Sequence, residues 1–170
     1  MKKLIFIAFA AFSVMPVKAA DTAAIGDQWK IQAKSDLSQA AYLFVIHAAD
    51  GYIKDDTLFL NNAGPSTLYF SDRPYRLAGH LGTDTFLAAW KKGSDSFEAN
   101  PPNVVISFQK AGKPVDITVE IAEPQFDGSD LKFRIIRVLQ EDKAIAPGKK
   151  FKFKHPSLFI DGYGCWVFGC

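Results

Sequence analysis

Residues 114–122 carry the feature that most constrains the fold, a strict alternation of apolar and polar side chains. The apolar set is Val115, Ile117, Val119 and Ile121, and the polar set between them is Asp116, Thr118 and Glu120. This period of two is typical of a β-strand with one buried face and one solvated face. Strand patterns at 104–109 and 130–139 flank it, separated only by the short segments 111–113 and 124–129. Because no helix-length segment intervenes, we expect an antiparallel meander that closes as a single β-sandwich or a partly open barrel.

The rest of the chain adds further strands and one helix. Strands are expected over 42–48, 56–61, 67–70, 151–154 and 157–160, with turns at Asp50-Gly51 and at 62–65. A helix is expected over 83–92, where apolar side chains fall at helical spacing. Thr83 suits its N-cap and Gly93 suits its end. The predicted fold class is mainly β with one short helix.

The first 19 residues have the pattern of a cleavable secretory signal peptide. Lys2 and Lys3 give a positive start, and the apolar run 4–15 is too short to span a bilayer, which needs roughly 20 apolar residues. We expect cleavage after Ala19 and delivery to the bacterial periplasm or the medium, an uncleaved anchor being the alternative. The predicted organisation is a signal peptide (1–19), a lead-in segment (20–41), a β-rich globular domain (42–161) and a cysteine-containing tail (162–170).

The charge balance narrows the class of partner. Removal of the leader takes Lys2, Lys3 and Lys18 with it, which turns the formal charge of +2 into −1. A nucleic-acid partner usually requires a clustered positive face, so we expect no nucleic acid. No apolar run after residue 19 is long enough to cross a membrane, so no membrane span is expected once the signal is removed. The remaining partner classes are a small anion or another protein.

Both cysteines of the chain, Cys165 and Cys170, lie in the last six residues. An exported protein keeps disulfides, so the favoured interpretation is a disulfide that ties down the tail. Free or intermolecular thiols and metal ligation are the alternatives. A redox-active pair is less favoured, because four residues rather than two separate the cysteines.

The segment Ser71-Asp72-Arg73-Pro74-Tyr75-Arg76-Leu77-Ala78-Gly79-His80 contains the candidate binding residues. Guanidinium groups match carboxylates and phosphates bidentately, so Asp72, Arg73, Arg76 and His80 form a candidate site for a small anion. The alternative is architectural: Asp72 caps the turn, and the two arginines pair with acids elsewhere in the domain.

A catalytic role for this segment is the runner-up interpretation. Asp72 and His80 could serve a hydrolase or a metal-dependent enzyme if they met across one cleft. The other histidines, His47 and His155, do not complete a metal-binding spacing, and no nucleophile elbow or phosphate-binding glycine loop is present. No cofactor and no metal site are therefore expected. The aspartates at 55–56 and 127–130 have the pattern of turns rather than of an EF-hand.

The same block also carries a resemblance to a family. Together with Asp95-Ser96-Phe97, the Pro101-Pro102-Asn103 turn and Ser157-Leu158-Phe159-Ile160-Asp161, it is similar to a family of uncharacterised exported bacterial proteins. The resemblance covers 43–161 and implies export and a single domain, without an activity to carry over. The cysteine-containing tail departs from the family pattern.

The segment Phe151-Lys152-Phe153-Lys154 alternates apolar and cationic side chains. This pattern is typical of an edge strand protected by lysines. Its alternative is a surface for an anionic polymer or lipid headgroups. Taken together, the sequence favours an exported binding or structural module without catalysis of its own.

Processing at the predicted site has a direct readout. Protein recovered from an exporting host should start at Ala20, and its intact mass should be lower by two hydrogen atoms for a closed Cys165–Cys170 disulfide. Intact-mass measurement before and after reduction tests both points. A chain that retains Met1 in the exported fraction would contradict the signal-peptide assignment.

Overall fold

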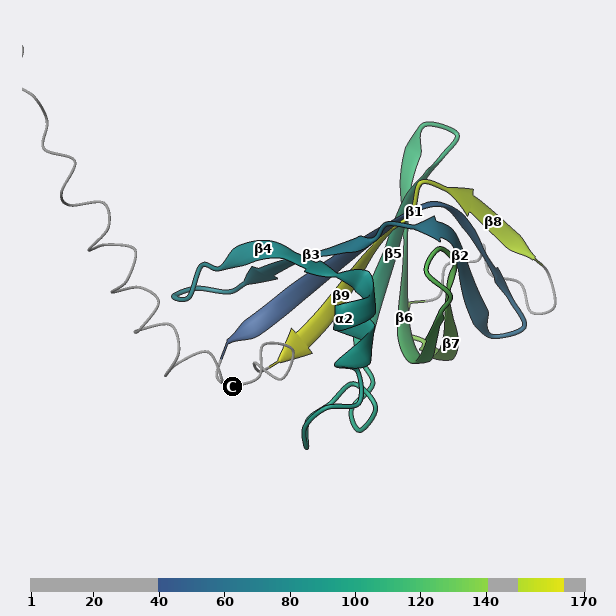
Figure 1. The fold of residues 1–170 in the computed structure, drawn as a ribbon. Coiled ribbons are helices and arrows are strands. Elements are labelled where there is room, and N and C mark those ends of the chain that lie inside the picture. Colours follow the sequence, from purple (N-terminus) through teal and green to yellow (C-terminus); the bar gives the residue numbers. More distant parts are fainter. Residues whose placement is uncertain (1–39, 141–149, 164–170) are drawn as a thin grey trace, which may run out of the picture.

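The structure is a computed structural model that describes residues 40–140 and 150–163. Within those ranges the chain forms one antiparallel sheet of nine strands and one short helix (Figure 1). The elements in chain order are β1 (Ala41–Lys54), β2 (Thr57–Ala63), β3 (Ser66–Ser71), β4 (Ala78–Gly82), α2 (Thr83–Ala88), β5 (Asn103–Lys110), β6 (Lys113–Phe126), β7 (Leu131–Val138), β8 (Phe151–Lys154) and β9 (Ser157–Tyr163). The predicted fold class, mainly β with one short helix, is confirmed. No helix of these two ranges is long and apolar enough to cross a membrane.

The strand order closes the sheet on itself. The hydrogen-bonded neighbours run β2-β7-β6-β5-β9-β1, and an additional pairing of β2 with β1 completes a ring. The predicted meander is the β5-β6-β7 part of that ring, because β6 pairs with β5 along one edge and with β7 along the other. The hairpin of β3 and β4 extends from β1 outside the ring (Figure 1).

The strand β1 holds the two halves of this arrangement together. Along one edge it pairs with β9 over Ala41–His47 and then with β8. Along the other edge it pairs with β3 and then with β2. The burial of its side chains alternates in two phases: Phe44 and Ile46 are buried in the first half, and Gly51 and Ile53 are buried in the second half, after a change of phase near Asp50. Because β1 has partner strands on both edges, it joins the two halves of the sheet.

The turn predicted at Asp50-Gly51 is wrong, because β1 continues through both residues to Lys54. Gly51 is required there by close packing rather than by a turn. A Cβ at this position would lie 2.6 Å from the backbone oxygen of Phe59 and 2.6 Å from a ring carbon of Phe153. The sequence pattern cannot distinguish a glycine of this kind from a turn glycine.

The helix also differs from its prediction. It spans Thr83–Ala88 rather than 83–92, and its N-cap is Gly82, not Thr83. The Thr83 hydroxyl is buried, donates a hydrogen bond to the Gly64 carbonyl at 2.7 Å and lies 3.1 Å from the Thr67 hydroxyl. Thr83 therefore joins the helix to the β2–β3 connection instead of capping it.

An aromatic cluster fills the space between the helix segment and the sheet. Phe86 contacts Phe44 with ring centroids 4.7 Å apart, and Trp90 lies 4.8 Å from Phe97 and 5.6 Å from Phe133. All five side chains are buried. These contacts hold α2 against β1 and the segment after α2 against β7, and the buried side chains form one continuous apolar core.

Two glycines give a matched test of this packing. Gly51→Ala should destabilise the fold by about 1–3 kcal/mol, because the new methyl group overpacks against backbone as well as side chain. Gly64→Ala should change the free energy of unfolding much less, since its Cβ would meet nothing nearer than 3.6 Å. Urea unfolding of the two variants measures the difference. Equal stabilities would refute the close approach at Gly51.

Candidate functional site

The candidate binding residues lie on the connection between β3 and β4. The two strands pair as far as Phe70 and Ala78, and residues 71–77 form the turn between them. The backbone N–H of Arg76 donates to the Asp72 carbonyl at 3.0 Å, and the N–H of Leu77 donates to the Ser71 hydroxyl at 2.7 Å. The turn is therefore closed by its own hydrogen bonds.

Asp72 fastens this turn to the start of β1. The Asp72 N–H donates to the Ala41 carbonyl at 3.0 Å, and the Ala41 N–H donates to the Asp72 carboxylate at 3.2 Å. The pKa of the nearby Tyr42 hydroxyl is raised, first by burial and then by the charges of Tyr69, Asp72 and Tyr75. Asp72 thus acts on the architecture of the turn, as the capping alternative proposed.

The two arginines of the turn differ from the other two arginines of the chain. Arg134 is paired with Glu123 at 2.8 Å, and Arg137 is paired with Glu120 at 2.6 Å. The side chains of Arg73 and Arg76 are exposed and have no hydrogen bond or ion pair within 40–140 and 150–163. The expected alternative, in which both pair with distant acids, is thus not found in this part of the chain. Two guanidinium groups remain available three residues apart.

His80 lies on the same hairpin but not beside Asp72. It faces Leu68 in the register of β3 and β4, and its Nδ1 lies 2.9 Å from the Ser66 hydroxyl. Its partner Leu68 lies four residues before Asp72, which corresponds to roughly 13 Å of extended chain. Asp72 and His80 therefore have separate hydrogen-bond partners, and the geometry does not bring them into one acid–base pair.

The remaining histidines occupy other places in the fold. The Nδ1 of His47 lies 2.9 Å from the Ser157 hydroxyl, across the pairing of β1 with β9. His155 is exposed between β8 and β9. Among the described residues no group of three or more histidines, cysteines or carboxylates is placed to hold a metal ion. Cys165 and Cys170, like the predicted signal peptide, lie outside the described residues.

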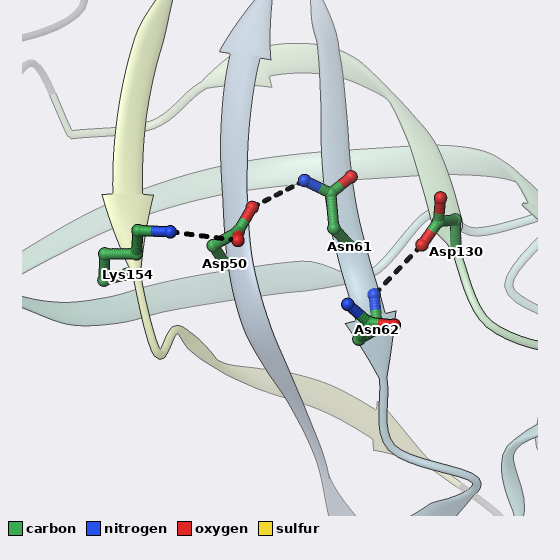
Figure 2. Close-up of polar contacts among 5 residues, drawn as sticks. All are labelled: Asp50, Asn61, Asn62, Asp130 and Lys154. Carbon is green, nitrogen blue, oxygen red and sulfur yellow. Dashed lines mark hydrogen bonds and ion pairs between the residues drawn. The ribbon is translucent and has the colours of Figure 1, made fainter.

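A second polar cluster lies on β1, β2 and β8 (Figure 2). The Asp50 carboxylate accepts a hydrogen bond from the Asn61 side chain at 2.5 Å and pairs with Lys154 at 3.1 Å. On the next residue, the N–H of Asn62 donates to Asp130 at 3.0 Å. Each carboxylate in this cluster already has a partner within the protein, so these groups serve to hold the strands together.

The aspartates of the 127–130 segment are likewise engaged. The Asp127 carboxylate accepts the backbone N–H groups of Ser129 at 3.0 Å and Asp130 at 2.7 Å. These hydrogen bonds, that of Asp130 first, lower the pKa of Asp127. The arrangement is an Asx turn between β6 and β7, as the sequence suggested.

One hollow gathers segments that are distant in the sequence. It has a volume of about 220 Å³, and its walls include Asp95, the residues 101–103, Glu120, Arg137 and Asp161. Three sequence segments noted above, containing Asp95, the Pro-Pro-Asn turn and Asp161, thus line one surface feature. Sequence reasoning missed Glu120 and Arg137, because only the pairing of β6 with β7 brings them there.

The Asp50 cluster gives a testable pKa. Hydrogen bonding from Asn61 and then Lys154 holds the pKa of Asp50 below its ordinary value. A carboxyl group whose pKa is lowered in the folded state stabilises the fold at pH values above its unfolded-state pKa. This stabilisation is lost as the pH falls through the folded-state pKa. Asn61→Ala should therefore raise the pKa of Asp50, which NMR titration of its side-chain carboxyl carbon measures. Asn103→Ala, an exposed asparagine on β5, should leave it unchanged; an unshifted Asp50 in Asn61→Ala would contradict the assignment.

Comparison of the chain with protein-family models, with curated proteins and with solved structures found no match.

Proposed function

We propose that this protein is a non-catalytic binding module that captures small anions, through carboxylate or phosphate groups, at the β3–β4 turn. The observation that supports the proposal is the contrast among its four arginines. The arginines on β7 are both paired with glutamates, whereas Arg73 and Arg76 are exposed without an acidic partner in the described chain. Unpaired guanidinium forks are the groups that recognise planar anions.

The turn gives these side chains a fixed base. The turn is tied to Ala41 of β1 by the Asp72 backbone N–H and by the Asp72 carboxylate, and it is closed internally by the Arg76 N–H. Arg76 is further held at a φ of +51°, a conformation that few residues adopt freely. A base that is ordered before binding lowers the entropic cost of capturing a ligand.

A binding role also accounts for the partners of Asp72 and His80. The Asp72 carboxylate accepts a hydrogen bond from the backbone of β1, and His80 is hydrogen-bonded to Ser66. A general acid–base pair would need these two groups within reach of each other or of one substrate atom. His80 remains a second contact for a ligand longer than one anionic group. The module would act outside the cytoplasm, after loss of residues 1–19.

The expected affinity is weak, because the site is open to solvent. Two charge-assisted hydrogen-bonding groups at an exposed position correspond to a dissociation constant on the order of 1 mM. Such values suit a ligand that is abundant or that carries several anionic groups.

Replacement of the two arginines tests the proposal. Titration of the isotopically labelled protein with inorganic phosphate and with citrate should shift the backbone amide signals of residues 72–77. Arg73→Gln with Arg76→Gln should reduce this response at least tenfold, because the bidentate donors are lost. Unfolding midpoints equal to those of the unmodified protein confirm that the variant is folded.

A matched control removes the same charge elsewhere. Lys92→Gln with Lys113→Gln eliminates two exposed cations that form no ion pair in the described chain, and it should leave the phosphate response intact. If both double variants lose the response equally, the effect is one of net charge and the proposed site is wrong. Absence of any shift at anion concentrations of roughly ten times the expected dissociation constant would also refute it.

A further inference from the structure

A row of four outward-facing side chains crosses four adjacent strands at the far end of β1. Tyr52 of β1 pairs directly with Lys152 of β8 on one side and with Phe59 of β2 on the other, and Phe59 pairs with Lys132 of β7. Their chain neighbours Gly51, Ile53, Leu58 and Leu60 are buried, which places the row on the outer face of the ring. The register alone puts two lysines at the ends of an aromatic pair.

The aromatic rings hold lysines in place. The rings of Tyr52 and Phe59 are stacked, with centroids 4.4 Å apart and an interplanar angle of 13°. The Nζ of Lys150 lies 3.4 Å from the Tyr52 centroid, and the Nζ of Lys132 lies 5.7 Å from the Phe59 centroid. Cation–π contacts of this kind fix ammonium groups that would otherwise move freely. We name Lys132, Lys150 and Lys152 the lysine band.

The lysine band is positive: Lys132 and Lys152 belong to one row, and Lys150, just before β8, places its ammonium group over the Tyr52 ring of that row. None of its three members has an ion pair in the described chain, whereas the cations of the two neighbouring rows are neutralised. Those pairs are Lys154–Asp50 at 3.1 Å on one side, and Lys54–Asp55 at 3.5 Å and Arg134–Glu123 at 2.8 Å on the other. The Asp127 carboxylate is hydrogen-bonded to backbone amides, which lower its pKa first, and the charge of Lys132 contributes to the lowered pKa, but this carboxylate forms no ion pair with the lysine.

Edge protection explains only part of this arrangement. Within the described chain β8 pairs only with β1, so the lysines at 150 and 152 guard a free strand edge. Lys132 lies three strands away on β7, which pairs on both sides there. An unpaired lysine at that position, aligned with the others, has no role in protecting the edge of β8.

We propose that the lysine band binds a linear polyanionic glycan that carries uronate carboxylates. A narrow positive stripe, roughly 14 Å long at three strand spacings of about 4.8 Å, complements one extended chain of negative groups. A membrane would instead engage a broad positive patch, and here the flanking rows are neutral. Bases of a nucleic acid would need an exposed ring face to stack on, and the faces of Tyr52 and Phe59 are covered by each other and by lysines.

The test uses oligomers of polygalacturonate and the full mature chain. Lys132→Gln with Lys152→Gln should weaken binding roughly tenfold and flatten the dependence of the affinity on salt, because fewer counterions are released. The control Lys92→Gln with Lys113→Gln removes the same charge and should bind like the unmodified protein. Amide shifts on binding should centre on Tyr52, Phe59 and Lys132.

Each alternative has its own outcome. Equal binding by both double variants, or shifts confined to residues 72–77, would overturn the lysine band as the site. Tighter binding to anionic phospholipid vesicles or to single-stranded DNA than to the glycan would assign the surface to a membrane or a nucleic acid instead. A Lys132→Gln, Lys152→Gln variant that aggregates yet binds polygalacturonate normally would leave edge protection as the only role.

Discussion

The pairing of β1 along both of its edges is the interaction on which the rest of this structure depends. One edge takes β9 and then β8, and the other takes β3 and then β2. Without the pairing of β1 to β2, the order β2-β7-β6-β5-β9-β1 would be an open sheet with two free edges. The close approach at Gly51 permits this closure, because a side chain there would collide with the backbone of β2.

Closure of the ring also determines which charged groups remain free to bind a ligand. The inward positions of the strands are apolar, so charged residues gather on the outer face, where cross-strand partners lie within reach of one another. Some of them neutralise each other in this way, as at Asp50, Glu120 and Glu123. The arginines of the β3–β4 turn and the lysine band have no such pair in the described chain, and neither do Lys92, Lys110 and Lys113. Exposed cations without an ion pair are free to meet an external anion.

Local patterns in the sequence predicted what is local in the structure. The alternation of 115–121 located β6, and the antiparallel class followed from the absence of intervening helices. The strand β4 was missed, because Ala78-Gly79-His80-Leu81-Gly82 has neither strong β propensity nor a clear alternation. The charge of Lys132 and the aromatic character of Tyr52 are visible in the sequence, but their alignment depends on registers among β1, β2, β7 and β8. Such registers join residues up to 100 positions apart, and no local signal specifies them.

The β3–β4 turn and the lysine band lie at opposite ends of β1, which makes the two sites physically independent. Asp72 anchors the turn at Ala41, whereas the lysine band crosses β1 at Tyr52, about 35 Å further along an extended chain. Charges that far apart are screened at physiological salt, where the Debye length is about 8 Å. Coupling through the protein would require an element with two arrangements, and β1 is held by partners on both edges throughout. Occupation of the turn by a small anion should therefore leave the affinity of the lysine band unchanged, so that each site can be assigned by its own variants.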